Sequence, residues 1–209
     1  EEFLGFNPRE IRNQEFARQL SYNYKKSDKS LVDERNQTTW LTLAYIESRK
    51  NVPTTEFIQG NAKIAAIEIA CKAHTGLLKE ADIEKILSKH GIAYSHVEKL
   101  EKTPIDAASV NVEGHPAIIT THRYNDMSRL IFNTLHELGH IELHMYKDNN
   151  EVFVSGDNYS SDSPKEREAN EFAQNMLIDK KLWDTMMNSG PIPGIRLGNI
   201  IEFNGKRKE

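Results

Sequence analysis

Residues 135–144 read LHELGHIELH, and this stretch limits the fold of the chain more than any other. His136 and His140 are four residues apart. On an α-helix their imidazole rings lie on one face, about one turn apart, and both can reach a single ion. Leucines and an isoleucine at helical spacing give the same helix an apolar stripe for packing. The alternative is an ordinary helix with polar residues on one side and no bound ion.

The residue types in this motif share one chemical purpose. Zinc prefers imidazole and carboxylate ligands, and a catalytic zinc site keeps one position open for water. Glu137, next to the first histidine, can take a proton from that water and later give it to a leaving amine. Gly139 leaves room for the close approach of a strand or a substrate. We therefore expect Zn²⁺, or another divalent ion in the cell, to be bound by His136 and His140, with Glu137 as catalytic base.

A zinc site of this kind needs a third protein ligand. His144 continues the four-residue spacing, but it lies another turn along the helix, about 6 Å further at 1.5 Å per residue. It is expected to bind a carbonyl group or to orient the residues around the ligands. A carboxylate from a later helix, predicted over residues 163–178, is the better source.

This later helix has a strong start signal and three candidate glutamates. Ser163 is a typical N-cap, Pro164 suits the first position, and Glu166 completes a capping box. Glu171 points away from the apolar stripe and is expected to be solvated. Glu168 lies at the border of the stripe, roughly 90° from its centre at 100° per residue. Glu168 is therefore the predicted third ligand.

The rest of the pattern predicts the fold class. Apolar periodicity predicts helices over residues 39–50, 62–74 and 78–91, a strand within 92–100, and two strands joined at Glu113-Gly114. With the two helices described above, this order predicts an α+β domain with a small antiparallel or mixed sheet packed on helices. Residues 117–120 are either an edge strand that pairs with an extended peptide or a core strand.

Composition excludes several functional classes. The formal net charge is −4, which does not suggest a nucleic-acid surface or an anionic membrane as partner. No apolar run approaches the ~20 residues of a membrane helix. The single cysteine, Cys71, rules out an internal disulfide framework and is expected to be a small buried residue. We expect a cytoplasmic protein.

The paired motifs HELGHIELH and EREANEFAQNMLI resemble those of the ImmA/IrrE family of zinc-dependent metallopeptidase domains. The resemblance covers roughly residues 62–178. It implies a zincin-like fold, in which an HExxH helix is followed by a ligand helix. It also implies metal ligands at His136, His140 and Glu168, with Glu137 as the base. His122, Arg123, Tyr124 and Arg129 precede the helix, and any of them could supply a further donor to the transition state; the alternative is that each is a surface or helix-start residue.

Members of this family often cleave or disable DNA-bound repressors, and many carry a helix-turn-helix module before the peptidase. The resemblance implies hydrolysis of a peptide bond in a protein substrate, a transcriptional repressor or an antitoxin. The alternative is a catalytically weak sensor or interaction domain of a regulator.

The family architecture also suggests how the chain is divided. The expected domains are a connector or remnant of an upstream module at 1–55, the metallopeptidase at 56–190 and an irregular tail at 191–209. Glu1 is not an initiator methionine, so we expect a fragment or a processed product, with DNA contacted only through a missing upstream module.

Overall fold

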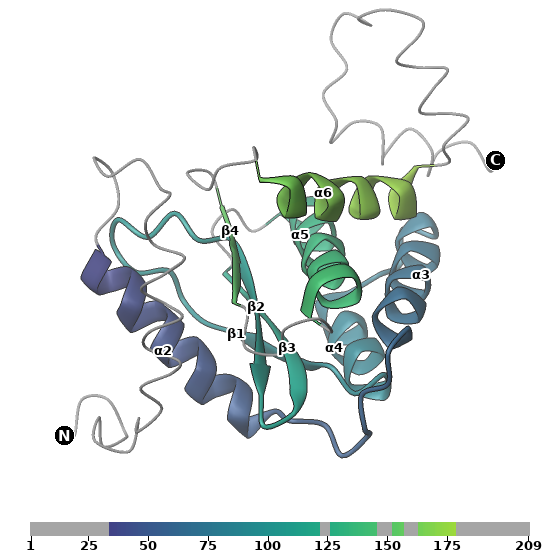
Figure 1. The fold of residues 1–209 in the computed structure, drawn as a ribbon. Coiled ribbons are helices and arrows are strands. Elements are labelled where there is room, and N and C mark those ends of the chain that lie inside the picture. The colour runs from purple at the N-terminus through teal and green to yellow at the C-terminus, as the bar shows by residue number, and fades with distance from the viewer. Residues whose placement is uncertain (1–33, 122–125, 146–151, 157–162, 179–209) are drawn as a thin grey trace, which may run out of the picture.

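The computed structural model describes residues 34–121, 126–145, 152–156 and 163–178 (Figure 1). Its fold is α+β, as predicted, with helices on both faces of one mixed sheet. The helices are α2 (Glu34–Lys50), α3 (Asn61–His74), α4 (Glu80–Lys89), α5 (Met127–His140), the π-helical turn η3 (Ile141–Met145) and α6 (Pro164–Leu177). The strands are β1 (Ala93–His96), β2 (Ala107–Val112), β3 (His115–Thr120) and β4 (Phe153–Ser155).

The four strands lie in the order β1-β3-β2-β4. β3 pairs in parallel with β1 and antiparallel with β2, and β2 also pairs antiparallel with β4. β3 therefore has hydrogen-bonded neighbours on both sides. The interpretation of residues 117–120 as an edge strand open to a peptide is wrong, and the described edges of the sheet are β1 and β4.

A tight turn joins β2 to β3, as the sequence predicted. Glu113 and Gly114 both have positive φ, 54° and 90°. Two successive residues of positive φ match the right-handed twist of the paired strands. The turn fixes the register in which Ser109 lies opposite Ile118.

The sheet separates two apolar layers, and its side chains alternate between them. Ala117 and Ile119 pack on the side of α2, together with its Trp40 and Leu41. Ile118 packs on the other side, in the core formed with α3, α4, α5 and α6. Figure 1 shows α2 on one face of the sheet and the remaining helices on the other. The HELGH motif thus lies on a helix in the larger layer.

The structure corrects several expectations at the N-terminal side. The helix predicted over residues 39–50 begins earlier than expected, at Glu34. Within the helix predicted over residues 62–74, Ile64 and Ile67 are 48% and 46% exposed, because α3 packs through its alanines. Cys71 is exposed rather than buried. The predicted tail at 191–209 lies outside the described residues.

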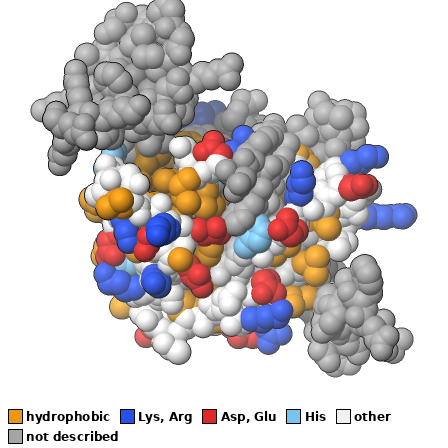
Figure 2. All heavy atoms as spheres, turned by 180° about the vertical axis from the view of Figure 1, so that it is seen from behind, with side chains coloured by type: hydrophobic (Ala, Val, Ile, Leu, Met, Phe, Trp, Pro, Cys, Tyr) orange, Lys and Arg blue, Asp and Glu red, His pale blue; other side chains and the backbone are white. Residues whose placement is uncertain are grey.

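The described surface has a mixed charge. On the face shown in Figure 2, basic and acidic side chains are interspersed, in keeping with the formal net charge of −4. Among the described helices, none combines the length and apolarity that crossing a bilayer requires.

Candidate metal centre

Helix α5 presents the two predicted histidines side by side. Asp126 caps the helix by accepting a hydrogen bond from the backbone N–H of Ser128. His140 is the last residue of α5 and is 0% exposed. His136 lies one turn earlier and is 4% exposed. Their Nε2 atoms are 3.0 Å apart. The four-residue spacing therefore directs both rings to one point, as predicted.

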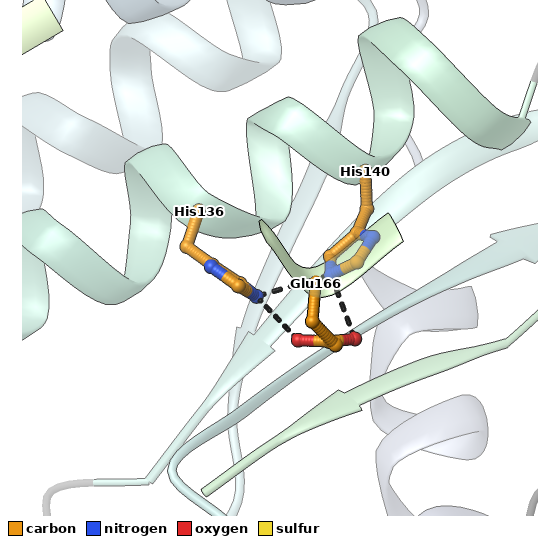
Figure 3. Close-up of side chains that lie close together, drawn as sticks. All are labelled: His136, His140 and Glu166. Carbon is orange, nitrogen blue, oxygen red and sulfur yellow. Dashed lines mark hydrogen bonds and ion pairs between the residues drawn. The ribbon is translucent and has the colours of Figure 1, made fainter. Parts of the chain in front are cut away.

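Glu166, from the first turn of α6, supplies a carboxylate at the same point. Its Oε2 atom lies 3.2 Å from Nε2 of His136, and its Oε1 atom lies 3.2 Å from Nε2 of His140 (Figure 3). One ligand atom from each residue can be chosen so that all three lie within 4.8 Å of one another. Two imidazoles and one carboxylate are a typical ligand set for catalytic zinc, so the residues present fit the ion that the motif implies.

The structure does not bring the predicted ligand Glu168 to this point. Glu168 and Glu166 are two residues apart, which is about 200° around a helix at 100° per residue. α6 packs through Ala169 and Ala173, and Glu166 belongs to that face because it precedes them by three and seven residues. The Glu168 side chain is 59% exposed.

The capping-box assignment of Glu166 explains why the sequence favoured Glu168. Ser163 is the N-cap as predicted, and its Oγ atom accepts a bond from the Glu166 backbone N–H at 3.5 Å. The Glu166 carboxylate, however, contacts the histidines instead of returning to the cap. The useful signal in the sequence is the spacing of Glu166, Ala169, Asn170 and Ala173 along one helical face.

Asn170 was not singled out from the sequence, but it supports the site from the same face of α6. Its Oδ1 atom lies 2.9 Å from Nδ1 of His136. An amide oxygen can only accept, so His136 carries a proton on Nδ1. A ligand histidine commonly uses its second nitrogen in this way, and the bond fixes both the ring and its tautomer. Because Glu166 and Asn170 are four residues apart, both side chains reach His136 from one face of α6.

A second set of contacts lies behind His140. Its Nδ1 atom is 3.1 Å from Nδ1 of His144, and Nε2 of His144 is 2.9 Å from Oε2 of Glu168. His144 is therefore outside the group around Glu166 and borders a ligand residue. Phe153 of β4 stacks on the His140 ring, with centroids 4.1 Å apart and planes at 16°.

Glu137, the predicted base, is fully buried between α5 and the sheet. Ser109 of β2 donates its hydroxyl to Oε2 at 2.7 Å, and Ser155 of β4 donates to Oε1 at 2.5 Å. Neither serine was predicted as a partner of Glu137, because each lies on a different strand, far from Glu137 in the sequence. Two adjacent strands thus hold the carboxylate that follows the first histidine in sequence.

The ionisable groups of the site change one another's pKa values. Burial raises the pKa of Glu166, but its contacts with His136 and His140 outweigh that effect and lower the pKa to about 2. Burial lowers the pKa of His136, but contact with Glu166 and the nearby Glu137 charge raise it more, so the net shift is upward. Burial lowers the pKa of His144 and outweighs the opposing bond with Glu168. The geometry therefore favours a negative carboxylate beside the rings of His136 and His140.

The candidate transition-state donors are only partly described. His122, Arg123 and Tyr124 lie outside the described residues. Arg129 forms an ion pair with Asp106, with Nη2 and Oδ2 2.5 Å apart. Since Asp106 is 5% exposed, this pair ties the first turn of α5 to the start of β2.

The fold, the convergent side chains and a comparison with protein families define a metallopeptidase-like domain. Residues 89–190 match the IrrE N-terminal-like domain, which is classed among the peptidases. The chain therefore contains an ImmA/IrrE-type domain, as its motifs indicated. The match begins later than the expected start at residue 62 and ends beyond residue 178. A comparison with curated proteins finds no match.

Proposed function

We propose that the chain is a zinc-dependent metalloendopeptidase domain of the zincin-like type. The observation that carries this proposal is the convergence of His136, His140 and Glu166 beside Glu137. His136, His140 and Glu166 would hold the ion, with Glu166 replacing the predicted Glu168. Zn²⁺, or another divalent ion in the cell, would supply Lewis-acid polarisation of the scissile carbonyl and a water of lowered pKa.

The protein's own residues would carry the proton transfers. Glu137 would accept a proton from the attacking water and later donate it to the leaving amine. The peptide C–N bond breaks, the water oxygen stays on the acyl carbon as the new carboxyl group, and the transferred proton ends on the amine nitrogen. Ser109 and Ser155 hold its carboxylate through two hydroxyl donors. Asn170 would keep the His136 Nε2 lone pair directed at the ion, because its Oδ1 atom accepts a hydrogen bond from the Nδ1–H group of His136.

The substrate proposal rests on the family. A peptidase family implies a protein substrate, and we propose a DNA-binding repressor or an antitoxin in the cytoplasm. In this proposal DNA would be contacted only through an upstream module, with 1–55 as connector, 56–190 as peptidase and 191–209 as tail. The role would be transcription regulation, including toxin–antitoxin control.

One observation favours the second candidate, a sensor or interaction domain with little peptidase activity. Glu137 is fully buried and both of its oxygens accept hydroxyl hydrogen bonds. If this arrangement persists when a partner binds, the base cannot reach an attacking water. The domain would then bind a regulator without cleaving it.

A cleavage assay on a proteome-derived peptide library separates the two candidates. Zinc-loaded wild type should generate new peptide ends, and Glu137→Gln should reduce their rate of formation about 10²–10⁴-fold while keeping its zinc. Glu171→Gln, an exposed glutamate on α6, is the matched control and should cleave like wild type. Equal cleavage by Glu137→Gln would exclude the mechanism. Zinc binding without cleavage in any variant would support the interaction domain.

A further inference from the structure

The residues behind His140 form a continuous hydrogen-bonded path to a second carboxylate. The path runs from Nδ1 of His140 to Nδ1 of His144 over 3.1 Å, then from Nε2 of His144 to Oε2 of Glu168 over 2.9 Å. His140 and His144 are 0% and 4% exposed, whereas the Glu168 side chain is 59% exposed. The path therefore leads from the buried site, through η3, to the protein surface at α6.

The two facing Nδ1 atoms restrict where the protons lie. Two donors or two acceptors cannot form a hydrogen bond, so one Nδ1 atom carries a proton and the other a lone pair. A ligand His140 needs its lone pair on Nε2, which places its proton on Nδ1. His144 must then accept at Nδ1 and carry its own proton on Nε2. An ionised Glu168 carboxylate, which only accepts, is the partner that this arrangement requires.

Local structure holds these rings in place. The α-helix changes into the π-helical turn η3 immediately after His140, and η3 contains His144. Such turns are rare and occur frequently at functional sites. Phe153 stacks on His140, and its centroid is also 5.5 Å from that of His144. The two rings are thus fixed by packing as well as by hydrogen bonds.

We propose that His144 and Glu168 are positioning residues, which hold His140 in the tautomer that presents the Nε2 lone pair to the ion. This inference rests on the proposed metal site. It assigns Glu168 a role beside a ligand rather than as a ligand. α6 then supports both histidines, His136 through Asn170 and His140 through Glu168 and His144.

The metal-free contacts at Nε2 of His140 oppose each other. Its Nε2 atom lies 3.0 Å from Nε2 of His136, and Oε1 of Glu166 is 3.2 Å away. A His136 ring that carries protons on both nitrogens can donate from Nδ1 to Asn170 and from Nε2 toward His140. The Glu166 carboxylate can only accept, so it favours a proton on Nε2 of His140 instead. We therefore expect the contacts with His144 and Glu168 to decide the His140 tautomer before zinc enters.

The direct test is long-range ¹H–¹⁵N correlation of the histidine rings in the full chain, with and without zinc. Ring signals are assigned through single histidine variants. Wild type should show the His140 proton on Nδ1 and the His144 proton on Nε2 in both states. Glu168→Ala should mix the His140 tautomers in the metal-free protein, whereas Glu171→Ala should leave them unchanged. A His140 proton on Nε2 in the metal-free wild type would overturn the proposal.

Zinc affinity provides the second readout, measured by competition with a chelator. Glu168→Ala and His144→Ala should weaken zinc binding about 10–100-fold, the usual effect of losing a residue that orients a ligand. Because the Glu168 side chain is largely exposed, its removal should leave folding intact even if His144→Ala does not fold. Wild-type affinity in folded Glu168→Ala would contradict the positioning role. A wild type that binds no zinc would instead refute the proposed function, and the ring spectra would still decide the tautomers.

Discussion

Gly139 of α5 lies directly against Ala169 of α6. A β-carbon added at Gly139 would lie 3.1 Å from the Ala169 Cα atom and 3.2 Å from the Phe172 Cβ atom. The glycine inside the HELGH motif therefore permits the close contact of the two helices that carry the proposed ligands. The expected purpose of Gly139, close approach of a strand or substrate, is replaced by close approach of a helix.

Gly139→Ala should separate the two helices slightly. Both contacts of the new methyl group fall in the range where neighbours must move by a few tenths of an ångström. We expect a loss of about 1–3 kcal/mol in the free energy of unfolding, as for other overpacked sites, and weaker zinc binding because Glu166 moves with α6. Urea denaturation and chelator competition measure the two effects. Gly76→Ala is unsuitable as a control, because the φ of Gly76 is 71° and an alanine in that conformation would be strained.

The control for Gly139→Ala is Ser88→Ala, an exposed position on α4 far from both ligand helices in the chain. It should change neither stability nor zinc affinity by a measurable amount. Unchanged zinc affinity in Gly139→Ala would show that the spacing of the two helices does not govern the site.

Ser109→Ala should destabilise the domain through Glu137. The substitution removes the hydroxyl that donates to Oε2 of a fully buried carboxylate. A buried charged group that loses a hydrogen bond costs about 1.5–3 kcal/mol. A double-mutant cycle with Glu137→Gln, followed by urea denaturation, isolates the interaction. Additive effects in the cycle would show that Ser109 does not stabilise Glu137.

The stability of the metal-free protein should depend on pH through Glu166 and His136. The Glu166 pKa falls from 4.5 to about 2 on folding, so its stabilising effect is complete above pH 4.5 and disappears as the pH falls toward 2. The His136 pKa rises from 6.5, so its effect is complete below pH 6.5 and disappears as the pH rises through the higher folded value. The joint stabilisation is therefore greatest between about pH 4.5 and 6.5.

Urea denaturation in the presence of a chelator, with Glu166→Gln as the comparison, measures this effect. The stability difference between wild type and Glu166→Gln should peak in that window and decrease on both sides. A difference that stays constant from pH 2 to 8 would contradict the ion pair.

Local patterns predicted the elements of the site well. The four-residue spacing of His136 and His140, the Ser163-Pro164 helix start and the Glu113-Gly114 turn each depend on short-range geometry, and the structure contains all three elements. Such features are encoded within a few residues, so periodicity and capping rules suffice to find them.

The rotation of a helix against its neighbours was harder to predict. The side of α6 that packs decides whether Glu166 or Glu168 reaches His136 and His140. That side contains Ala169, which lies against Gly139 of α5. α3 gave the same difficulty. Hydrophobicity alone would place Ile64 and Ile67 in the core, but the alanine face is the one that packs. Side-chain hydrophobicity alone does not show which helix face packs when that face consists of small residues such as alanine and glycine.

Metal content is the most direct test of the central claim that His136, His140 and Glu166 hold a metal ion. Wild type, Glu166→Ala and Glu171→Ala would be equilibrated with zinc, freed of excess and analysed by mass spectrometry. We predict about one zinc per chain in wild type and in Glu171→Ala, and a large loss in Glu166→Ala. A Glu166→Ala protein that keeps wild-type zinc would contradict the account, and so would a wild type that retains none.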